Sequence, residues 1–455
     1  MLDRLIHALR QLNTPYAEIR LERRELTSLV FRGDQLETVD TSIDYGGFAR
    51  ALAAQGGWGA VTFTGDTDLR ERVIDAIRLA QASDADPITL APIAPITDQV
   101  SANLPIDFRS IALAEKQALL AAYNDQMLRF DPRIESTYAT YLDTFSSVWY
   151  ANTDGTAIYQ ERPLIDLQLT AIARDGDNVQ RGSKSLALAA GYEAVLERSE
   201  LAHAAAQLAL VQLTAKRVRS RRYTVVLDPI MAGLFTHEAF GHLSEADFIA
   251  ENPQAQEMMT LGRQFGPRNL NIFDDGSVPR LRGSVRYDDE GVPTQKTWLM
   301  RDGVLVGRLH SRETAGLMNE QPTGNGRATS YRYGPQVRMT NTAIAPSDGG
   351  SLHDLIKDVD LGVYACDWAG GETLLEDFTF VAKHGYMIRR GQLAEPLRAM
   401  TLTGNLFETL KKIDGIGSDF AWDDSSGDCG KGAEGLPVCD GGPHLRMRDV
   451  LVGGA

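Results

Sequence analysis

Residues 237–242 bring two histidines and a glutamate together in the short segment His-Glu-Ala-Phe-Gly-His. Imidazole nitrogen is a preferred ligand of zinc, and a catalytic zinc site takes three protein ligands and leaves a fourth position to water. A neighbouring carboxylate can take a proton from that water and pass it to the leaving amine of a peptide. The segment therefore predicts a zinc site at His237 and His242, with Glu238 as general base on zinc-bound water.

The spacing of these histidines differs from that of ordinary zinc proteases. In those enzymes the second histidine follows the first by four positions, which returns both rings to nearly the same helix face. Here it follows by five, and an unbroken helix would leave the imidazoles about 140° apart. We therefore expect a one-residue helical bulge or a kink, which Gly241 would make inexpensive. Spacing alone leaves open that both histidines are structural residues without a metal.

Other polar segments give weaker indications. Cys429 lies in the glycine-rich segment 427–432, where small neighbours favour an accessible thiol that is either a metal ligand or a reactive group. The acidic segment 288–291 could bind a cation, although a tight acidic turn is the commoner structure. The segment 323–327 could approach a phosphate, but no helix is predicted after it. Of the other histidines, His310 has the most polar surroundings.

The remaining histidines are expected to be structural or at the surface. These histidines are His7, His203, His353, His384 and His444. Cys439 follows Cys429 by ten residues, which is too far for a zinc knuckle, and the roles of Cys366 and Cys439 stay open. Three cysteines in a chain of 455 residues do not form the pattern of a disulfide framework.

Composition excludes several classes of function. The formal net charge of −15 repels phosphate backbones and disfavours a nucleic-acid partner. The basic cluster at 216–222 is expected to be a solvated helix end. No stretch of about 18 apolar residues is present, so no membrane association is expected. The N-terminus lacks the pattern of a signal peptide, and a cytoplasmic location follows by elimination.

The first half of the chain must be built from strands and helices in alternation. Helical periodicity predicts helices over 2–13, 69–82, 112–128 and 186–220. Alternating polarity and turn residues predict strands from residue 17 and over 28–32, 47–53, 59–64, 136–143, 146–151, 157–161 and 164–174. A hairpin is expected at 152–155, and the proline-rich segment 87–106 is expected to be a linker or an extended crossing.

The second half must hold the motif. An apolar strand is predicted over 223–228, and Pro229 is expected to begin the helix that carries His237. The remainder is rich in strands and turns. We therefore expect an α+β protein with a domain boundary near Ser220. Residues 1–220 would form an antiparallel-sheet domain with two strand-then-helix segments, about 15–85 and 136–215, and residues 221–455 a strand-rich metalloprotease domain ending in the Cys429 loop.

The chain resembles the TldD/PmbA family, also called TldD/TldE, over nearly its whole length. The segments that carry the resemblance are HEAFGHLSEAD (237–247), NIFDDGS (271–277), YDDEGVPTQ (287–295), TGNGRATSYR (323–332), RMTNT (338–342) and GDCGKGAEGLPV (427–438). The His-Glu-x-x-x-His element is typical of the TldD-like, catalytic branch, and the TldE-like branch lacks it.

This resemblance implies roles for individual residues. His237 and His242 resemble the two histidine ligands of one zinc ion per chain, and Cys429 the third ligand. Glu238 resembles the catalytic glutamate. Two further residues of the matching segment, Glu245 and Asp247, are candidates for supporting a histidine ligand. His310 and Arg327 are candidates for stabilising the oxyanion.

The resemblance also implies an activity and partners. We expect proteolysis of unfolded or extended peptides, held through backbone pairing with a strand. We expect a homodimer, or a heterodimer with a TldE/PmbA-like paralogue. The alternative is a non-catalytic peptide-binding or chaperone-like module with a structural zinc. A third possibility, modulation of gyrase by direct DNA contact, conflicts with the charge of −15.

Overall fold

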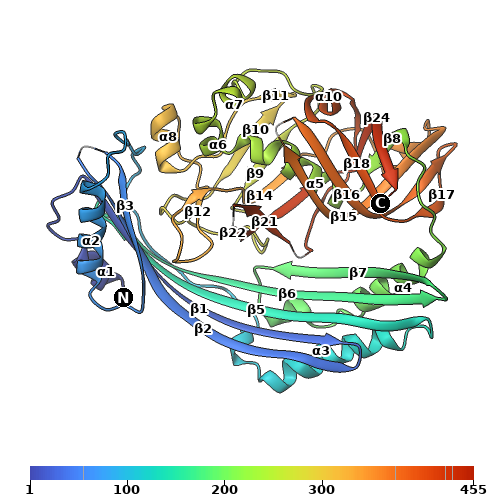
Figure 1. The fold of residues 1–455 in the computed structure, drawn as a ribbon, viewed down its shortest axis with the longest axis horizontal. Helices are drawn as coiled ribbons and strands as arrows, with labels where there is room; N and C mark the ends of the chain where they lie inside the picture. Colours follow the sequence, from blue (N-terminus) through green and yellow to red (C-terminus); the bar gives the residue numbers. More distant parts are fainter. Residues whose placement is uncertain (55, 375, 426, 433, 455) are drawn as a thin grey trace.

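The computed structural model describes residues 1–54, 56–374, 376–425, 427–432 and 434–454 (Figure 1). Helices and long antiparallel strands are mixed, which confirms the predicted α+β class. The helices of the first half are α1 (Leu2–Ala8), α2 (Leu69–Gln81), α3 (Leu113–Leu128) and α4 (Ser199–Thr214). Its strands are β1 (Tyr16–Arg32), β2 (Gln35–Leu52), β3 (Trp58–Thr64), β4 (Thr97–Val100), β5 (Ile134–Asn152), β6 (Ala157–Asp175) and β7 (Asn178–Leu188).

These seven strands form one sheet with the order β3-β2-β1-β5-β6-β4, and β7 also pairs with β6. The predicted helices over 69–82 and 112–128 are confirmed as α2 and α3. The predicted linker 87–106 contains β4, which pairs in parallel with β6. The helix predicted over 2–13 already ends at Ala8.

Several sequence predictions are wrong in this half. The strands expected from residue 17 and over 28–32 are one strand, β1, and those expected over 136–143 and 146–151 are one strand, β5. The strands expected over 157–161 and 164–174 are one strand, because Pro163 lies between the parts of β6 that pair with β4 and with β7. Among the described strands, none pairs with that edge of β6 at Pro163, so proline is tolerated there. The long helix expected over 186–220 begins only at Ser199. Leu186–Leu188 belong to β7 instead, where pairing with β6 overrides an alanine- and leucine-rich composition.

The second half holds the remaining sheets. One follows the order β15-β8-β24-β18-β16-β17 with β19 on β24, and another the order β11-β10-β9-β14-β23-β20. The strands are β8 (Arg221–Leu227), β9 (Ile272–Asp275), β10 (Lys296–Arg301), β11 (Val304–Leu305), β12 (Gly326–Arg327), β13 (Gln336–Val337), β14 (Asn341–Ile344), β15 (Leu361–Leu374), β16 (Asp377–Arg389), β17 (Gln392–Leu397), β18 (Met400–Asn405), β19 (Ile413–Ile416), β20 (Ala421–Trp422), β21 (Asp428–Lys431), β22 (Glu434–Pro437), β23 (Cys439–Gly442) and β24 (Leu445–Gly454). The helices are α5 (Pro229–Thr236), α6 (Ala246–Glu251), α7 (Pro253–Met258), α8 (Arg312–Met318), α9 (Leu352–Ile356) and α10 (Leu406–Lys411).

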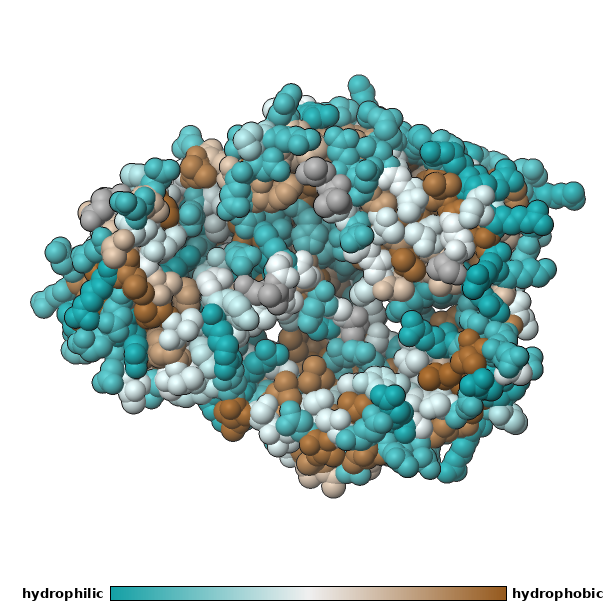
Figure 2. Space-filling view, in the orientation of Figure 1, coloured by the Kyte–Doolittle hydropathy of each residue, from teal (hydrophilic) through white to brown (hydrophobic). Residues whose placement is uncertain are grey.

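The first sheet lies beneath the second half of the chain (Figure 1), and the space-filling view is hollowed between them (Figure 2). We propose residues 1–220 and 221–455 as the two domains, because the first sheet ends before Ser220 and the others begin after it. Within the described residues, no helix is long and apolar enough to cross a membrane.

Buried ion pairs join the two halves. Arg50 of β2 contacts Glu18 of β1 at 2.6 Å and Glu290 at 2.7 Å, and Arg20 of β1 contacts Asp289 at 3.2 Å. The acidic segment 288–291 is thus a tight turn in which Asp289 and Glu290 bind arginines of the first sheet. Separating the two halves would leave these buried charges without their partners, which is energetically costly. The ion pairs therefore favour one relative position of the two halves.

Candidate metal centre

The helix that carries the motif begins at a well-defined residue. The strand before it, β8, is buried and pairs with β15 and β24. Asp228 caps α5 by accepting a hydrogen bond from the backbone N–H of Met231 at 2.7 Å, and Pro229 occupies the first turn. The predicted helix start is confirmed, and α5 delivers His237 at its C-terminal end.

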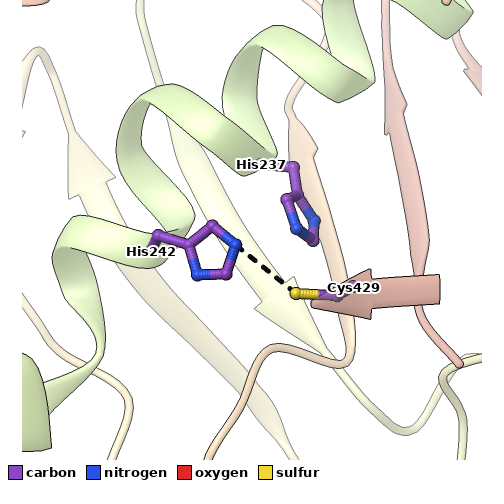
Figure 3. Close-up of side chains that lie close together, drawn as sticks. All are labelled: His237, His242 and Cys429. Atoms are coloured by element: carbon purple, nitrogen blue, oxygen red, sulfur yellow. Dashed lines mark hydrogen bonds between the residues drawn. The ribbon is translucent and has the colours of Figure 1, made fainter. Parts of the chain in front are cut away.

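The helix changes its winding at the motif. His237–Gly241 form a π-helical turn, and His242–Ser244 form a 3₁₀ turn. A π-helical turn holds one residue more than an α-helical turn, so the predicted bulge is confirmed. The two imidazoles now lie edge to face, with ring centroids 4.9 Å apart and planes at 88° (Figure 3).

Gly241 serves the bulge in a different way from the one predicted. Its backbone is right-handed helical, with φ −60° and ψ −57°, so conformational freedom is not what the position requires. A Cβ atom there would overlap the sulfur of Met339, which is fully buried. The glycine therefore lets the π-helical turn pack closely against Met339.

Cys429 completes the group from the hairpin of β21 and β22. Its Sγ lies 3.4 Å from Nε2 of His242 (Figure 3), and one ligand atom from each of His237, His242 and Cys429 lies within 4.8 Å of the others. The thiol was expected to be accessible, but the residue is only 4% exposed. Burial alone would raise the pKa of Cys429, but His237 and His242 lower it to about 5, which favours the thiolate that binds metals.

The histidines are oriented by two carboxylates. Asp440 of β23 lies 2.8 Å from Nδ1 of His237, and Glu245 lies 3.3 Å from Nδ1 of His242. Each contact engages Nδ1 and leaves Nε2 for a metal. Glu245 therefore lies where the resemblance indicated support for a histidine. Asp440 was missed, although a carboxylate in the otherwise apolar, glycine-rich segment 438–442 was a signal that could have identified it.

Asp247 contacts the hairpin of β21 and β22 and not a histidine ligand. Lys431 of β21 donates to both oxygens of Asp247 at 2.8 Å and to Glu245 at 3.0 Å. The same ammonium donates to the carbonyl of Val337 at 3.0 Å. Lys431 thus ties the strand that carries Cys429 to the segment that follows His242.

Two buried arginines hold the backbone of the same hairpin. Arg338 donates to the carbonyl of Cys429, and Arg327 donates to the carbonyl of Pro437 at 2.8 Å. Arg327 lines a second cavity, of ≈ 400 Å³, on the side of the first sheet. His310 is buried elsewhere, 3.1 Å from both Thr314 and Glu320. Within the described residues, neither Arg327 nor His310 lines the cavity of the metal group.

Glu238 lies with the metal group in a cavity of ≈ 580 Å³. Trp368 and Gly371 form part of its wall, and a Cβ atom at Gly371 would lie 3.4 Å from Cγ of Glu238. Burial raises the pKa of Glu238 above its usual value, which is the direction that suits a general base.

The donor set fits a catalytic zinc ion. Zinc accepts imidazole nitrogen and thiolate sulfur, and three protein ligands leave a position for water. Two imidazoles, a thiol and the Glu238 carboxylate in one cavity are the groups that a metallopeptidase centre requires.

Comparison with known proteins agrees with this class. Residues 17–83, 106–213 and 220–454 match the first, central and C-terminal domains of the PmbA/TldA metallopeptidases. A metalloprotease of Synechocystis is 45% identical, covering 98% of this chain and 96% of that protein. A zinc metalloprotease TldD homolog of Saccharolobus solfataricus is 32% identical over 72% of this chain and 74% of its own. The chain belongs to the TldD/PmbA family of metallopeptidases.

Solved structures show the same fold. TldE from Thermococcus kodakarensis superposes with a TM-score of 0.76 at 17% identity, covering 97% of each chain. A Thermotoga maritima protein named for modulation of DNA gyrase has a TM-score of 0.79 at 22% identity, covering 96% of each chain.

Proposed function

We propose that this metalloprotease hydrolyses peptide bonds of unfolded or extended peptides. In this proposal His237, His242 and Cys429 hold one zinc ion per chain, and Glu238 is the general base. The observation that carries the proposal is the convergence of these three donors within 4.8 Å, in the cavity that Glu238 also lines.

Each residue then has a defined task. When bound, zinc polarises a carbonyl group and lowers the pKa of a water molecule. Glu238 would take a proton from the attacking water as its oxygen bonds to the carbonyl carbon, and would pass that proton to the amine when the C–N bond breaks. Asp440 and Glu245 keep the imidazoles in one orientation, and Lys431 keeps the Cys429 strand beside them. The wall formed by Trp368 and Gly371 limits the access of bulk water to the carboxylate.

The shape of the site supports an extended substrate. A cavity of ≈ 580 Å³ has room for a few side chains of a peptide and excludes a folded domain. The hairpin of β21 and β22 pairs with no other described strand. Arg327 already binds the Pro437 carbonyl of β22, so β21 is the strand that we propose for backbone pairing with a peptide. Such pairing recognises the main chain and gives little sequence preference.

We also propose that the chain acts as a dimer, either with a second copy or with a TldE-like paralogue. The common fold with TldE supports a partner of similar shape.

A peptide-binding module with structural zinc is the alternative function. A structural site is closed by four protein ligands, whereas the group found within the described residues has three. This open position supports the enzyme.

The test compares the wild type with Glu238→Gln, measuring bound zinc and cleavage of a labelled unfolded protein. We expect both to bind one zinc ion per chain and only the wild type to cleave. Cleavage by the variant would contradict the role of Glu238. If both bind zinc and neither cleaves, adding a TldE-like chain distinguishes a missing partner from a binding module. Glu257→Gln, on an exposed turn of α7, is the matched control.

A further inference from the structure

One strand of the first sheet contacts a wall of the metal cavity. In Figure 1, β7 forms the margin of that sheet that faces the second half of the chain. Nζ of Lys184 in β7 donates to Oδ2 of Asp367 in β15 at 2.8 Å, and the backbone N–H of Ala187 donates to the carbonyl of Asp424 at 2.7 Å. Asp367 directly precedes Trp368 of the cavity wall, and Asp424 directly follows the residue that binds the indole of Trp368. The first sheet therefore supports this wall at two points.

The chain takes an uncommon backbone conformation at Asp367. Its φ of 50° lies in the left-handed region, which few residues other than glycine adopt, and the register between β15 and β16 shifts directly after it, between Trp368 and Gly370. The N–H of Asp367 donates to Oδ2 of Asp228 at 3.1 Å, while its carboxylate binds Lys184. A conformation of this kind persists only where the surrounding contacts fix it. Lys184 is thus one of the contacts that determine where Trp368 lies.

Trp368 presents an apolar surface to the metal cavity. Its indole N–H donates to Oδ2 of Asp423 at 2.6 Å, so the one polar atom of the ring is already bound. A Cβ atom at Gly427 would lie 2.7 Å from Cη2 of the ring, which means that the segment before Cys429 packs directly against it. The part of the ring that lines the cavity is therefore hydrocarbon surface.

The rest of this cavity offers a substrate further apolar groups. Other apolar side chains in its lining are Leu234, Leu243, Phe248 and Val438. Three of its carboxylates are already bound by protein groups: Asp423 by Trp368, Asp440 by His237, and Glu245 by Lys431. Burial of an apolar side chain here removes apolar surface from water, which is favourable. An acidic side chain would instead lose its hydration in a cavity that Glu238 and Glu372 also line.

We propose that Trp368 binds an apolar side chain of the substrate beside the scissile bond, and that Lys184 is the positioning residue that keeps Trp368 there. The inference rests on the proposed function and adds one position of preference to a substrate that is otherwise held by its main chain. It also gives the first sheet a part in substrate selection, because Lys184 belongs to that sheet. The expected substrates are unfolded peptides that contain leucine, phenylalanine or methionine.

The first test compares two quenched fluorescent peptides that differ at one central residue, within a stretch of serine and glycine. One peptide carries leucine there, and the other carries asparagine, which has a similar shape. With the zinc-loaded, full-length chain we expect kcat/KM to be about 10-fold or more higher for the leucine peptide. Trp368→Ala should lose most of this preference and keep its zinc. The matched control is Trp149→Ala, which removes a partly buried indole of the first sheet and should keep the preference.

The second test addresses the positioning role of Lys184. Lys184→Met should lose the preference mainly through a higher KM for the leucine peptide, because the metal group and Glu238 are unchanged. Lys184→Arg should restore the preference, since it keeps the charge that binds Asp367. Arg181→Met removes a charge from an exposed position of the same strand and should have no effect. In Trp368→Ala, adding Lys184→Met should change the preference no further, because both residues act through one surface. Additive losses would overturn the positioning role.

A binding measurement separates this inference from the proposed function. In fluorescence anisotropy, zinc-loaded Glu238→Gln should bind the labelled leucine peptide about 10-fold more tightly than the asparagine peptide. The double variant Trp368→Ala/Glu238→Gln should bind both peptides alike. Equal affinities or absent binding in Glu238→Gln would overturn the inference, and so would a preference that survives Trp368→Ala. If the wild type cleaves neither peptide while Glu238→Gln shows the preference, the proteolytic function is wrong and the binding role of Trp368 stands.

Discussion

The ammonium of Lys431 lies 3.0 Å from Oε2 of Glu245, and the same oxygen lies 3.3 Å from Nδ1 of His242. One carboxylate therefore joins the strand that carries Cys429 to the helix that carries His242. The two ligand segments are distant in sequence and belong to different elements. Their relative position depends on this contact and on the arginines that hold the hairpin backbone.

Replacing Lys431 should weaken zinc retention without unfolding the chain. In Lys431→Met the hairpin loses its contacts with Glu245 and Asp247, and we expect zinc release to a chromophoric chelator to be about 10- to 100-fold faster, the usual scale for supporting residues of a metal site. Lys431→Arg should restore much of the retention because it keeps the charge. Lys411→Met removes an exposed ion pair of α10 and serves as control. Unchanged release in Lys431→Met would show that the hairpin is held without this contact.

Asp440 should raise the affinity for zinc because it orients the imidazole of His237. Asp440→Asn leaves Nδ1 of His237 without a charged acceptor, and zinc affinity should fall by about 10- to 100-fold in competition titrations. The chain offers a matched control in Asp419, which contacts His444 outside the metal cavity. Asp419→Asn should leave zinc affinity unchanged, and equal losses in both variants would indicate a general effect on folding.

Gly241→Ala should strain the π-helical turn. The added methyl group would overlap the sulfur of Met339, and overpacking of this kind costs about 1 to 3 kcal/mol in urea unfolding. Met339→Ala in the same chain would remove the overlap, so the double variant should be less destabilised than the sum of the two single variants. Additive effects would mean that Met339 is not what the glycine accommodates.

Asp228 should make stability depend on pH. Burial raises its pKa to about 7, above the value of about 3.9 expected in the unfolded chain. The folded state therefore holds the proton more tightly, and stability present below pH 4 is lost as pH rises towards 7. Asp228→Asn keeps a capping oxygen and does not titrate, so its advantage over the wild type should grow across that interval. An advantage that is constant with pH would contradict the raised pKa.

The sequence by itself determined the features that depend on neighbouring residues. Helical periodicity located α2 and α3, and the five-residue spacing of the histidines required an extra residue in the turn, which became the π-helical segment 237–241. The types of His237, Glu238 and His242 already indicated zinc chemistry. Cys429 was assigned only through the resemblance to the family.

Tertiary structure decided the features that depend on distant segments. Asp440 orients His237 across 203 positions of sequence, and such a contact has no local pattern. Pairing with β6 made Leu186–Leu188 a strand although their composition favoured a helix. Arg327, expected near the oxyanion, instead holds the Cys429 hairpin, because a buried guanidinium binds whichever carbonyl the fold brings to it. Local propensities act over a few residues, whereas burial and charge pairing are set only when remote segments meet.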